Sequence, residues 1–323
     1  MPPHKPSNIS CDIKLSSMNP IEGKLYSPFQ KEKWNSFVKM TPDTERGFDF
    51  GHTVETVWER LDATVTKIRT GNGFLIKNFR ELIEEVAIVT ISNKSYEMFY
   101  RGQSNDYKNS QSIFYKDKKP KTIIYPAICR PEKNEDGSYK HSLRKTQLTK
   151  RYNELYNMVD SVAGKRSYLP EYHFALFQHY HICPTPLIDI TQSLRVAATF
   201  ALRDSTTGYV YVFGLPYPNQ SISHYTDMGI VLVKLQNVCP VEALRPRYQE
   251  GYLVGKYPFY PAKEGADNLA RRLVAKFYLD NNTGTFWDSD FQPIPEDVLF
   301  PKNDKIELEL KRAKNAFFAK YHS

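Results

Sequence analysis

Apolar residues recur every three or four positions in two stretches near the start of the chain, which is the spacing of an amphipathic helix. The first stretch covers residues 54–68 and ends at Gly71. The second opens at Asn78, where Glu81 gives a start that resembles a capping box. The side chains expected to face the core are Val54, Val57, Trp58, Leu61, Val65 and Ile68 in the first helix, and Phe79, Leu82, Ile83 and Val86 in the second.

The same spacing predicts helices later in the chain. One helix is expected over residues 143–159, and another over residues 170–180, where Pro170 suits the first helical position. Residues near the C-terminus that follow a helical period are Leu269, Leu273 and Phe277, and, after a cap formed by Asp304 with Glu307, Ile306, Leu310, Ala313 and Phe317. The chain is therefore expected to end in helices.

Strands are predicted by runs of β-branched and aromatic residues, most of which fall in the second half of the chain. The predicted strands cover residues 97–101, 187–191, 208–214 and 229–235, with a further strand within 245–254. The second of them leads through Ser193 into a short apolar helix over residues 196–202. Because helices come first and strands gather later, the pattern indicates an α+β fold and not alternating βαβ units.

These elements divide the chain into three parts. Residues 1–50 contain many Pro, Ser and Lys residues without a period, so we expect an arm that wraps the domain or is partly disordered. The main domain is expected over residues 51–260, with a polar loop at 131–140, and a helical extension is expected over residues 261–323.

Composition and charge narrow the class of protein. The 323 residues are 41% hydrophobic and 25% charged, which is ordinary for a soluble globular protein. No apolar run reaches the roughly 18–20 residues that span a bilayer, and the first residues lack a signal-peptide pattern, so we expect a cytoplasmic protein with no membrane partner. The net charge of +8 favours anionic partners, namely nucleic acid, a dinucleotide or an acidic protein.

Several kinds of site are disfavoured by motifs that the sequence lacks. The four cysteines stand far apart and show no Cys/His ligand spacing, so we expect reduced thiols and no metal. The GxGxxG, Walker, HExxH and GxSxG motifs are also absent, which argues against the cofactor and nucleophile classes that they mark.

Three polar segments carry the candidate chemistry, and the first is Tyr100-Arg101-Gly102-Gln103. An arginine at a strand end can hold a phosphate through bidentate hydrogen bonds, and a neighbouring glycine lets a ligand approach the backbone. The structural alternative is an ion pair between Arg101 and a carboxylate near a turn.

The second segment runs from Gln178-His179-Tyr180 to Thr191-Gln192-Ser193. Small hydroxyl residues at a strand-to-helix turn suit ligand positioning, because the start of a helix offers free N–H groups. In the alternative interpretation, Thr191 or Ser193 only caps the helix that follows.

Two further residues of this segment can titrate. Asp189 lies inside an apolar strand, and a buried carboxylate needs partners or a shifted pKa. A buried ion pair of Asp189 with Arg101 or Arg195 is the structural alternative to a functional role. His179 is either a ligand contact or a satisfied core histidine.

The third segment, Arg245 to Tyr252, contains the neighbouring residues Gln249 and Glu250. In a strand, neighbours point to opposite faces, so at most one of these two side chains can face a common pocket. The alternative is a polar turn before a strand.

In this order, the three segments resemble the FRG domain. That family has an aromatic-Arg-Gly motif near its start, a Gln-His-Tyr-Gly run that leads through Pro-Thr to Leu-Leu-Asp-Trp-Thr, a helix ending in Phe-Ala, and a later Arg-x-x-x-Gln-x-Gly pattern. The matching positions are Tyr100 to Gln103, Gln178 to Tyr180, Pro184 and Thr185, Leu187 to Thr191, Ala197 to Ala201, and Arg245 to Gly251. The chain departs from the family at His181, which replaces a glycine, and at Ile190, which replaces the tryptophan.

A fainter similarity, in the order and type of residues, connects the chain to ADP-ribosyltransferases. It implies a helical N-terminal half packed on a mixed or antiparallel split sheet. It also implies ADP-ribosyl transfer from NAD, or NAD glycohydrolysis, by a toxin or phage-defence effector that uses an unknown protein or nucleic-acid acceptor. The alternative is a non-catalytic module that binds a nucleotide or nucleic acid.

The resemblance assigns roles to individual residues. Arg101 would hold the pyrophosphate, Thr191 or Ser193 would orient the first segment, and Gln249 or Glu250 would bind the ribose and stabilise positive charge. The remaining candidates for contacts to NAD are Tyr100, Gly102, Gln103, His179, Tyr180 and Asp189.

Overall fold

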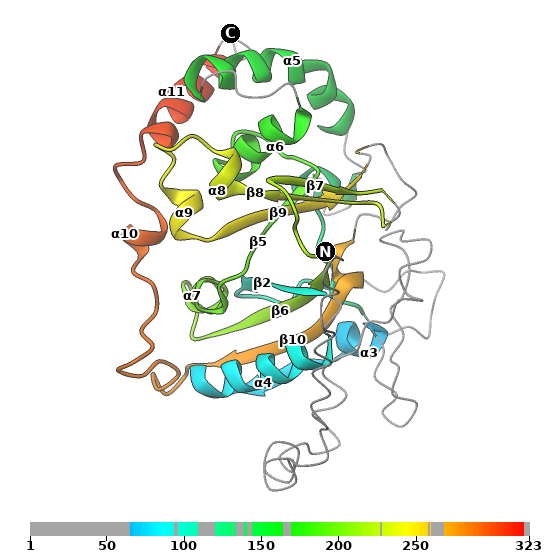
Figure 1. Cartoon of the computed structure of the whole chain (residues 1–323), viewed down its shortest axis with the longest axis vertical. Coiled ribbons are helices and arrows are strands. Elements are labelled where there is room, and N and C mark those ends of the chain that lie inside the picture. The colour runs from blue at the N-terminus through cyan, green and yellow to red at the C-terminus, as the bar shows by residue number, and fades with distance from the viewer. Residues whose placement is uncertain are drawn as a thin grey trace, which may run out of the picture.

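The structure is a computed structural model, which describes residues 65–93, 96–108, 120–130, 132–133, 139–140, 144–163, 169–226, 228–257, 259 and 268–319. Within these ranges the chain forms an α+β fold, with helices around a mixed, mostly antiparallel sheet (Figure 1). The predicted fold class is confirmed at this level. The predicted arm over residues 1–50 lies outside the described ranges.

Eight strands of the described chain form one sheet in the order β1-β10-β6-β2-β5-β9-β8-β7. Their bounds are β1 Phe74–Ile76, β2 Glu97–Gln103, β5 Leu187–Thr191, β6 Thr207–Leu215, β7 Ile222–Tyr225, β8 Ile230–Lys234, β9 Gly251–Lys256 and β10 Leu273–Asp280. The β1–β10 pair is parallel and the other pairs are antiparallel. A separate hairpin of β3 (Glu132–Lys133) and β4 (Tyr139–Lys140) lies where a polar loop was predicted, so that prediction is wrong at these residues.

The sheet is split between β2 and β5. These two strands are paired in register only at Tyr100 and Thr191, whereas β2 pairs with β6 along its whole length. One group of strands is therefore β1-β10-β6-β2 and the other is β5-β9-β8-β7. Figure 1 shows the first group in the lower part of the molecule and β8 and β9 in the upper part, with β5 running between them.

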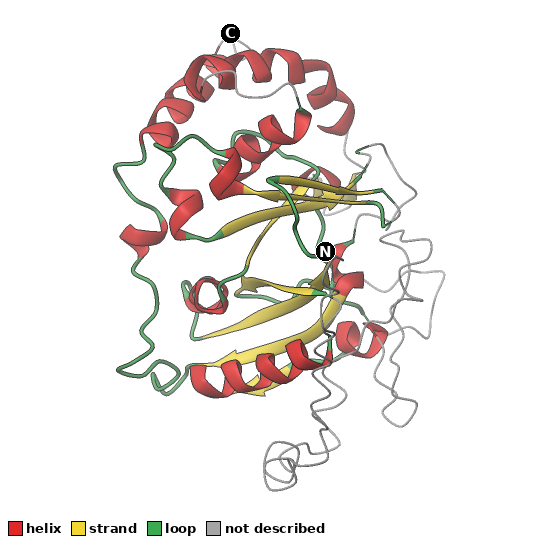
Figure 2. Ribbon diagram, viewed as in Figure 1, coloured by secondary structure: helices red, strands yellow, loops and turns green. Residues whose placement is uncertain are grey.

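Helices cover the outer sides of both groups of strands. Their bounds are α3 Val65–Thr70, α4 Phe79–Ser92, α5 Arg144–Ala163, α6 Pro170–His179, α7 Leu194–Leu202, α8 Leu235–Val238, α9 Arg245–Tyr248, α10 Glu296–Leu299 and α11 Lys305–Ala319, and the 3-10 turns are η3 Ala127–Cys129 and η4 Leu269–Arg272. Figure 2 shows α4 beneath the lower strands, and α5, α6 and α11 above the upper ones. No helix of the described ranges is long and apolar enough to cross a membrane.

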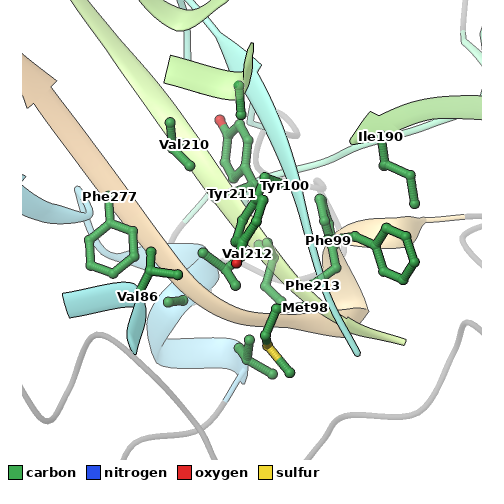
Figure 3. Close-up of a cluster of buried hydrophobic side chains, with 14 of the residues drawn as sticks. Val86, Met98, Phe99, Tyr100, Ile190, Val210, Tyr211, Val212, Phe213 and Phe277 are labelled. Atoms are coloured by element: carbon green, nitrogen blue, oxygen red, sulfur yellow. The ribbon is translucent and has the colours of Figure 1, made fainter. Parts of the chain in front are cut away.

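Two hydrophobic cores lie against the sheet, and the larger one takes residues from both groups of strands. The larger core includes Phe99, Tyr211 and Phe213 from neighbouring strands, and Phe277 faces Val86 of α4 at its edge (Figure 3). The second core lies among α5, α6, α11 and the upper strands. Burial of this apolar surface is the main favourable contribution to folding. Because the larger core also contains Ile188 and Tyr252, it joins the two groups of strands.

Glycines let α7 lie directly against β2 and β6. A Cβ atom added to Gly102 would stand 1.8 Å from the carbonyl oxygen of Ala197, and one added to Gly208 would stand 2.2 Å from that of Ala201. Gly102 lies inside β2 and does not end the strand as predicted. Its lack of a side chain therefore serves the packing of α7.

We predict that Gly102→Ala destabilises the protein by at least about 1–3 kcal/mol, the range for overpacking a core, because α7 must move away from β2. Thermal or urea unfolding measures the change. Gly251→Ala is the matched control, because its added Cβ comes too close only to the end of the flexible Leu235 side chain, at 2.8 Å, and lies at ordinary contact distances of 3.6 Å and 3.8 Å from Pro246 and His179. Equal stability of the two variants would contradict this interpretation of Gly102.

Most of the predicted elements are confirmed within the described ranges. The side chain of Asn78 caps α4 by accepting from the N–H of Glu81 at 2.9 Å, and α6 begins at Pro170. Asp304 accepts from the N–H of Glu307 at 3.0 Å and so caps α11. The predicted strands at 187–191, 208–214 and 229–235 correspond to β5, β6 and β8.

Two predictions from apolar spacing are wrong. Leu273 and Phe277 belong to β10, a strand between β1 and β6, and not to a helix. The segment from 261 onward thus completes the same sheet and is not purely helical. Ile83 of α4, which was expected to face the core, is 36% exposed.

Candidate functional site

A cavity of about 310 Å³ lies at the split in the sheet. Its walls come from β2, β5, the start of β9, the end of α6, α7, α9, and the segments that follow α6, α7, α9 and α10. The lining residues are Tyr100, Arg101, Gly102, His179, His181, Asp189, Ile190, Thr191, Val196, Ala197, Phe200, Arg203, Arg245, Gln249, Gly251 and Phe300. The three segments that the sequence singled out therefore meet at one cavity.

Arg101 reaches across the split from β2 to β5. Its Nη1 donates a hydrogen bond of 2.6 Å to the backbone carbonyl oxygen of Asp189, and its Nε has no hydrogen-bond partner among the described residues. Burial lowers the pKa of the Arg101 guanidinium, and the negative charge of Asp189 partly offsets that effect. An arginine nevertheless stays protonated in a protein, so Arg101 places a positive charge in the cavity wall. No ion pair among the described residues neutralises this charge.

Asp189 is held by residues of α6. Its Oδ2 accepts a hydrogen bond of 2.7 Å from Gln178 Nε2, and its Oδ1 lies 3.4 Å from His179 Nδ1. Thr185 in turn donates to Gln178 Oε1 at 2.7 Å, which fixes the orientation of the amide. The Asp189 side chain is 36% exposed because it faces the cavity.

These contacts determine the protonation states of Asp189 and His179. Burial alone would raise the pKa of Asp189, but the hydrogen bond from His179, the bond from Gln178 and the charge of Arg101 hold it well below its usual range. Burial lowers the pKa of His179, and this effect outweighs the opposing hydrogen bond to Asp189. At neutral pH the pair therefore consists of a carboxylate and a neutral imidazole.

Positive charge and aromatic rings make up much of the remaining wall. Arg101, Arg203 and Arg245 line the cavity together with one carboxylate, that of Asp189. Arg203 also pairs with Asp204 at 2.8 Å, and Arg245 lies 3.9 Å from Glu307, neither of which lines the cavity. The guanidinium carbons of Arg245 and Arg203 lie 4.8 Å and 5.5 Å from the centroid of the Phe300 ring. This lining suits an anionic ligand that also has flat, stackable groups.

The three motif segments line one cavity, and one family model covers two of them. Residues 96–209 match the family model of the FRG domain. The chain carries an FRG domain. Comparisons with curated proteins and with solved structures found no match.

The FRG match contains only part of the cavity. It includes Arg101, His179, Asp189 and the whole of α7, but it ends before α9. Arg245 and Phe300 are therefore contributed by residues beyond the FRG match.

Thr191 and Ser193 have structural roles in this FRG domain. The Thr191 hydroxyl donates to the carbonyl oxygens of Gln249 at 2.9 Å and Glu250 at 3.2 Å, and it accepts from the N–H of Ser193 at 3.0 Å. Ser193 is the N-cap of α7, where its hydroxyl accepts from the N–H of Val196. Thr191 lines the cavity, but Ser193 does not.

Gln249 and Glu250 do not lie on a strand. They form the turn between α9 and β9, in which Glu250 adopts a positive φ of 45° and is exposed. Gln249 lines the cavity, but its Nε2 donates to the carbonyl oxygen of Leu299 at 2.8 Å. The structure thus supports the alternative of a polar turn, and Glu250 is not among the lining residues.

Of the predicted NAD contacts, Tyr100, Gly102, His179 and Asp189 line the cavity. Gln103 and Tyr180 do not. The Tyr180 hydroxyl instead donates to the carboxylate of Asp304 at 3.1 Å, inside the second core.

Sequence reasoning missed several lining residues. Arg245 is the first residue of the third segment, but only Gln249 and Glu250 of that segment were predicted to be site residues. Arg203 and Phe300 belong to no motif. Among the described residues no group of three or more His, Cys, Asp or Glu side chains is placed to hold a metal ion.

The buried, neutral His179 should make stability depend on pH. Because burial lowers its pKa in the folded state, the unfolded chain takes up a proton first as the pH falls below the ordinary histidine pKa of about 6.5. The free energy of unfolding should then fall with decreasing pH, by up to about 1.4 kcal/mol per pH unit for one proton. We predict that His179→Gln has a shallower dependence than the wild type in urea unfolding between pH 7 and about pH 5. Identical slopes would show that His179 is not buried in its neutral form.

Proposed function

We propose that the cavity binds NAD and that the protein transfers the ADP-ribosyl group to an acceptor or hydrolyses the bond between ribose and nicotinamide. The observation that carries this proposal is the position of Arg101. Its guanidinium lies at the split of the sheet, beside a cavity, with Nε unpaired among the described residues and without a carboxylate partner.

Charge and size both favour a dinucleotide. The pyrophosphate of NAD carries two negative charges, which match the excess of guanidinium groups over carboxylates in the wall. Phe200 and Phe300, whose ring centroids lie 5.9 Å apart, offer surfaces for a base or a nicotinamide ring. The volume of about 310 Å³ is at the lower end for ligand sites, so the cavity would enclose the reacting end of the molecule.

The split of the sheet supports a resemblance to the fold of ADP-ribosyltransferases. In both cases an arginine on an early strand stands beside the gap between two groups of strands, and a strand with small hydroxyl residues leads into a helix. This similarity concerns layout alone. The chain departs from it in the third segment, because Gln249 and Glu250 lie in a turn.

Asp189 is the group that can take the role that the resemblance assigned to Gln249 or Glu250. The bond from C1′ of the ribose to the nicotinamide nitrogen breaks through an oxocarbenium-like transition state, and its electron pair leaves with nicotinamide. A carboxylate that stays ionised in the cavity wall stabilises the positive charge that develops on the ribose. Arg101, Arg203 and Arg245 would hold the pyrophosphate.

We predict that Arg101→Gln lowers both NAD affinity and the release of nicotinamide, because the pyrophosphate loses a bidentate partner. The loss of a charged hydrogen bond corresponds to about 1.5–3 kcal/mol, or roughly a 10- to 100-fold change. Calorimetry with NAD and chromatography of the products measure the two effects. Unfolding curves show whether the variant is still folded.

Arg80→Gln is the matched control, because Arg80 pairs with Asp288 and Asp290 at the surface and lies outside the cavity. It should bind and turn over NAD as the wild type does. If the folded wild type neither binds NAD nor releases nicotinamide with any protein or nucleic-acid acceptor tested, the proposal is wrong.

A second candidate is a module that binds a nucleotide or nucleic acid without turnover. It is favoured by the turn at Gln249 and Glu250, which leaves the exposed Glu250 out of the cavity wall. We predict for this case that affinity for a nucleotide or an oligonucleotide falls steeply as salt is raised from 50 to 200 mM, while no product forms. Product formation at any salt concentration would exclude it.

An enzyme that consumes NAD faster than the cell replaces it depletes the cell of NAD. Such an activity fits the role of a toxin or phage-defence effector, and we propose that it takes place in the cytoplasm, where NAD is available. The acceptor would be a protein or a nucleic acid.

A further inference from the structure

One edge of the His179 ring is engaged and the other is not. Nδ1 faces Asp189 Oδ1 at 3.4 Å, whereas Nε2 is buried and has no hydrogen-bond partner among the described residues. A buried polar atom without a partner is unfavourable by about 1–3 kcal/mol, so its retention needs an explanation. His179 lines the cavity, where a ligand can supply the missing partner.

The tautomer of His179 follows from its neighbours. An ionised Asp189 accepts but cannot donate, so the proton of the neutral ring must be on Nδ1. Nε2 then carries the lone pair. The bond from Gln178 to Oδ2 keeps the carboxylate in place, so ring and carboxylate are held as a unit.

We propose that His179 is the general base that takes the proton from the oxygen nucleophile attacking the ribose, and that Asp189 holds its ring. This inference rests on the proposed function, and it names a catalytic residue and an acceptor class for it. The acceptor is water or a hydroxyl group. The excess of arginine in the cavity wall disfavours the cationic side chains of lysine and arginine as acceptors.

The step balances as follows. The bond between C1′ and nicotinamide breaks, and its electron pair leaves with nicotinamide. A bond forms between C1′ and the acceptor oxygen, and the oxygen's proton passes to Nε2 of His179. The imidazolium is stabilised by Asp189 and later releases its proton to solvent, so one proton appears for each NAD consumed.

Several charged groups surround this imidazole. Asp189 on β5 and Asp304 before α11 favour its protonation, whereas Arg245 on α9 disfavours it. His181, in the segment after α6, lies close enough to interact as well. Burial and Arg245 lower the pKa of His179, which keeps Nε2 free to accept a proton at neutral pH.

The test measures NAD hydrolysis by the full chain, with water as the acceptor, in His179→Ala and His179→Gln. We expect nicotinamide release to fall by about 10²-fold or more, which is the usual contribution of a general base, while NAD affinity stays within a few-fold of the wild type. Added imidazole should restore part of the activity of His179→Ala, because it can occupy the vacated space. In the wild type, kcat should fall as the pH drops below the His179 pKa, and this limb should be missing in His179→Gln.

His224→Ala is the matched control. His224 Nε2 lies 2.9 Å from Glu171 Oε1 in another pair of imidazole and carboxylate, which does not line the cavity. This variant should keep wild-type activity and gain nothing from imidazole.

The outcomes separate this inference from the function on which it rests. If the wild type releases nicotinamide and folded His179 variants do so at the same rate, His179 is not the base although the proposed function stands. If both variants unfold, or if imidazole fails to rescue folded His179→Ala, His179 belongs to the core and the inference is wrong. If the wild type itself neither binds nor hydrolyses NAD, both proposals fail together.

Discussion

The single register pair between Tyr100 and Thr191 is the constraint on which the candidate site depends. Had β2 and β5 paired along their length, main-chain hydrogen bonds would have closed the sheet and left no space at its centre. Instead the gap is bridged by the Arg101 side chain, which donates to the carbonyl oxygen of Asp189. The hydroxyl of Thr191 ties the turn at Gln249 and Glu250 to the same point. The cavity is thus a consequence of the way the two groups of strands diverge.

Burying several guanidinium groups beside one carboxylate is unfavourable unless an anion joins them. Arg101 has lost the solvation of its Nε and gained only a carbonyl partner. Arg245 also has a buried Nε without a partner among the described residues, but its Nη1 lies 3.9 Å from a carboxylate oxygen of Glu307. A charge needed only for stability would be expected to have a carboxylate partner, as Lys276 has in Asp106 at 2.8 Å. The contrast between Lys276 and Arg101 supports the proposal that the charge of Arg101 serves a ligand.

Local chemistry made much of the fold predictable from sequence. Asn78, Pro170 and Asp304 each mark a helix start through a cap or a fixed φ angle, and each of these starts was placed correctly. Ser193 was one of two candidate caps for α7, which begins at Leu194 and not at the predicted position 196. Strand β10 was not predictable in the same way. Its apolar residues Leu273 and Phe277 also fit a helical period. Lys276 is an unexpected residue in a central strand, and its partner Asp106 is distant in the sequence. Tertiary contacts, and not local propensity, decided this element.

The candidate site shows the same division between local and distant information. The sequence motifs identify Arg101, His179 and Asp189, all of which line the cavity, because residue type and order along the chain are visible in the sequence. Which side chains of the third segment face the cavity depends on whether that segment is a strand or a turn, and the positive φ of Glu250 decides it in favour of the turn. Phe300 joins the wall from beyond the FRG match through its contacts with two arginines. The matched residues alone leave the cavity without one wall, and the segments that follow them complete it.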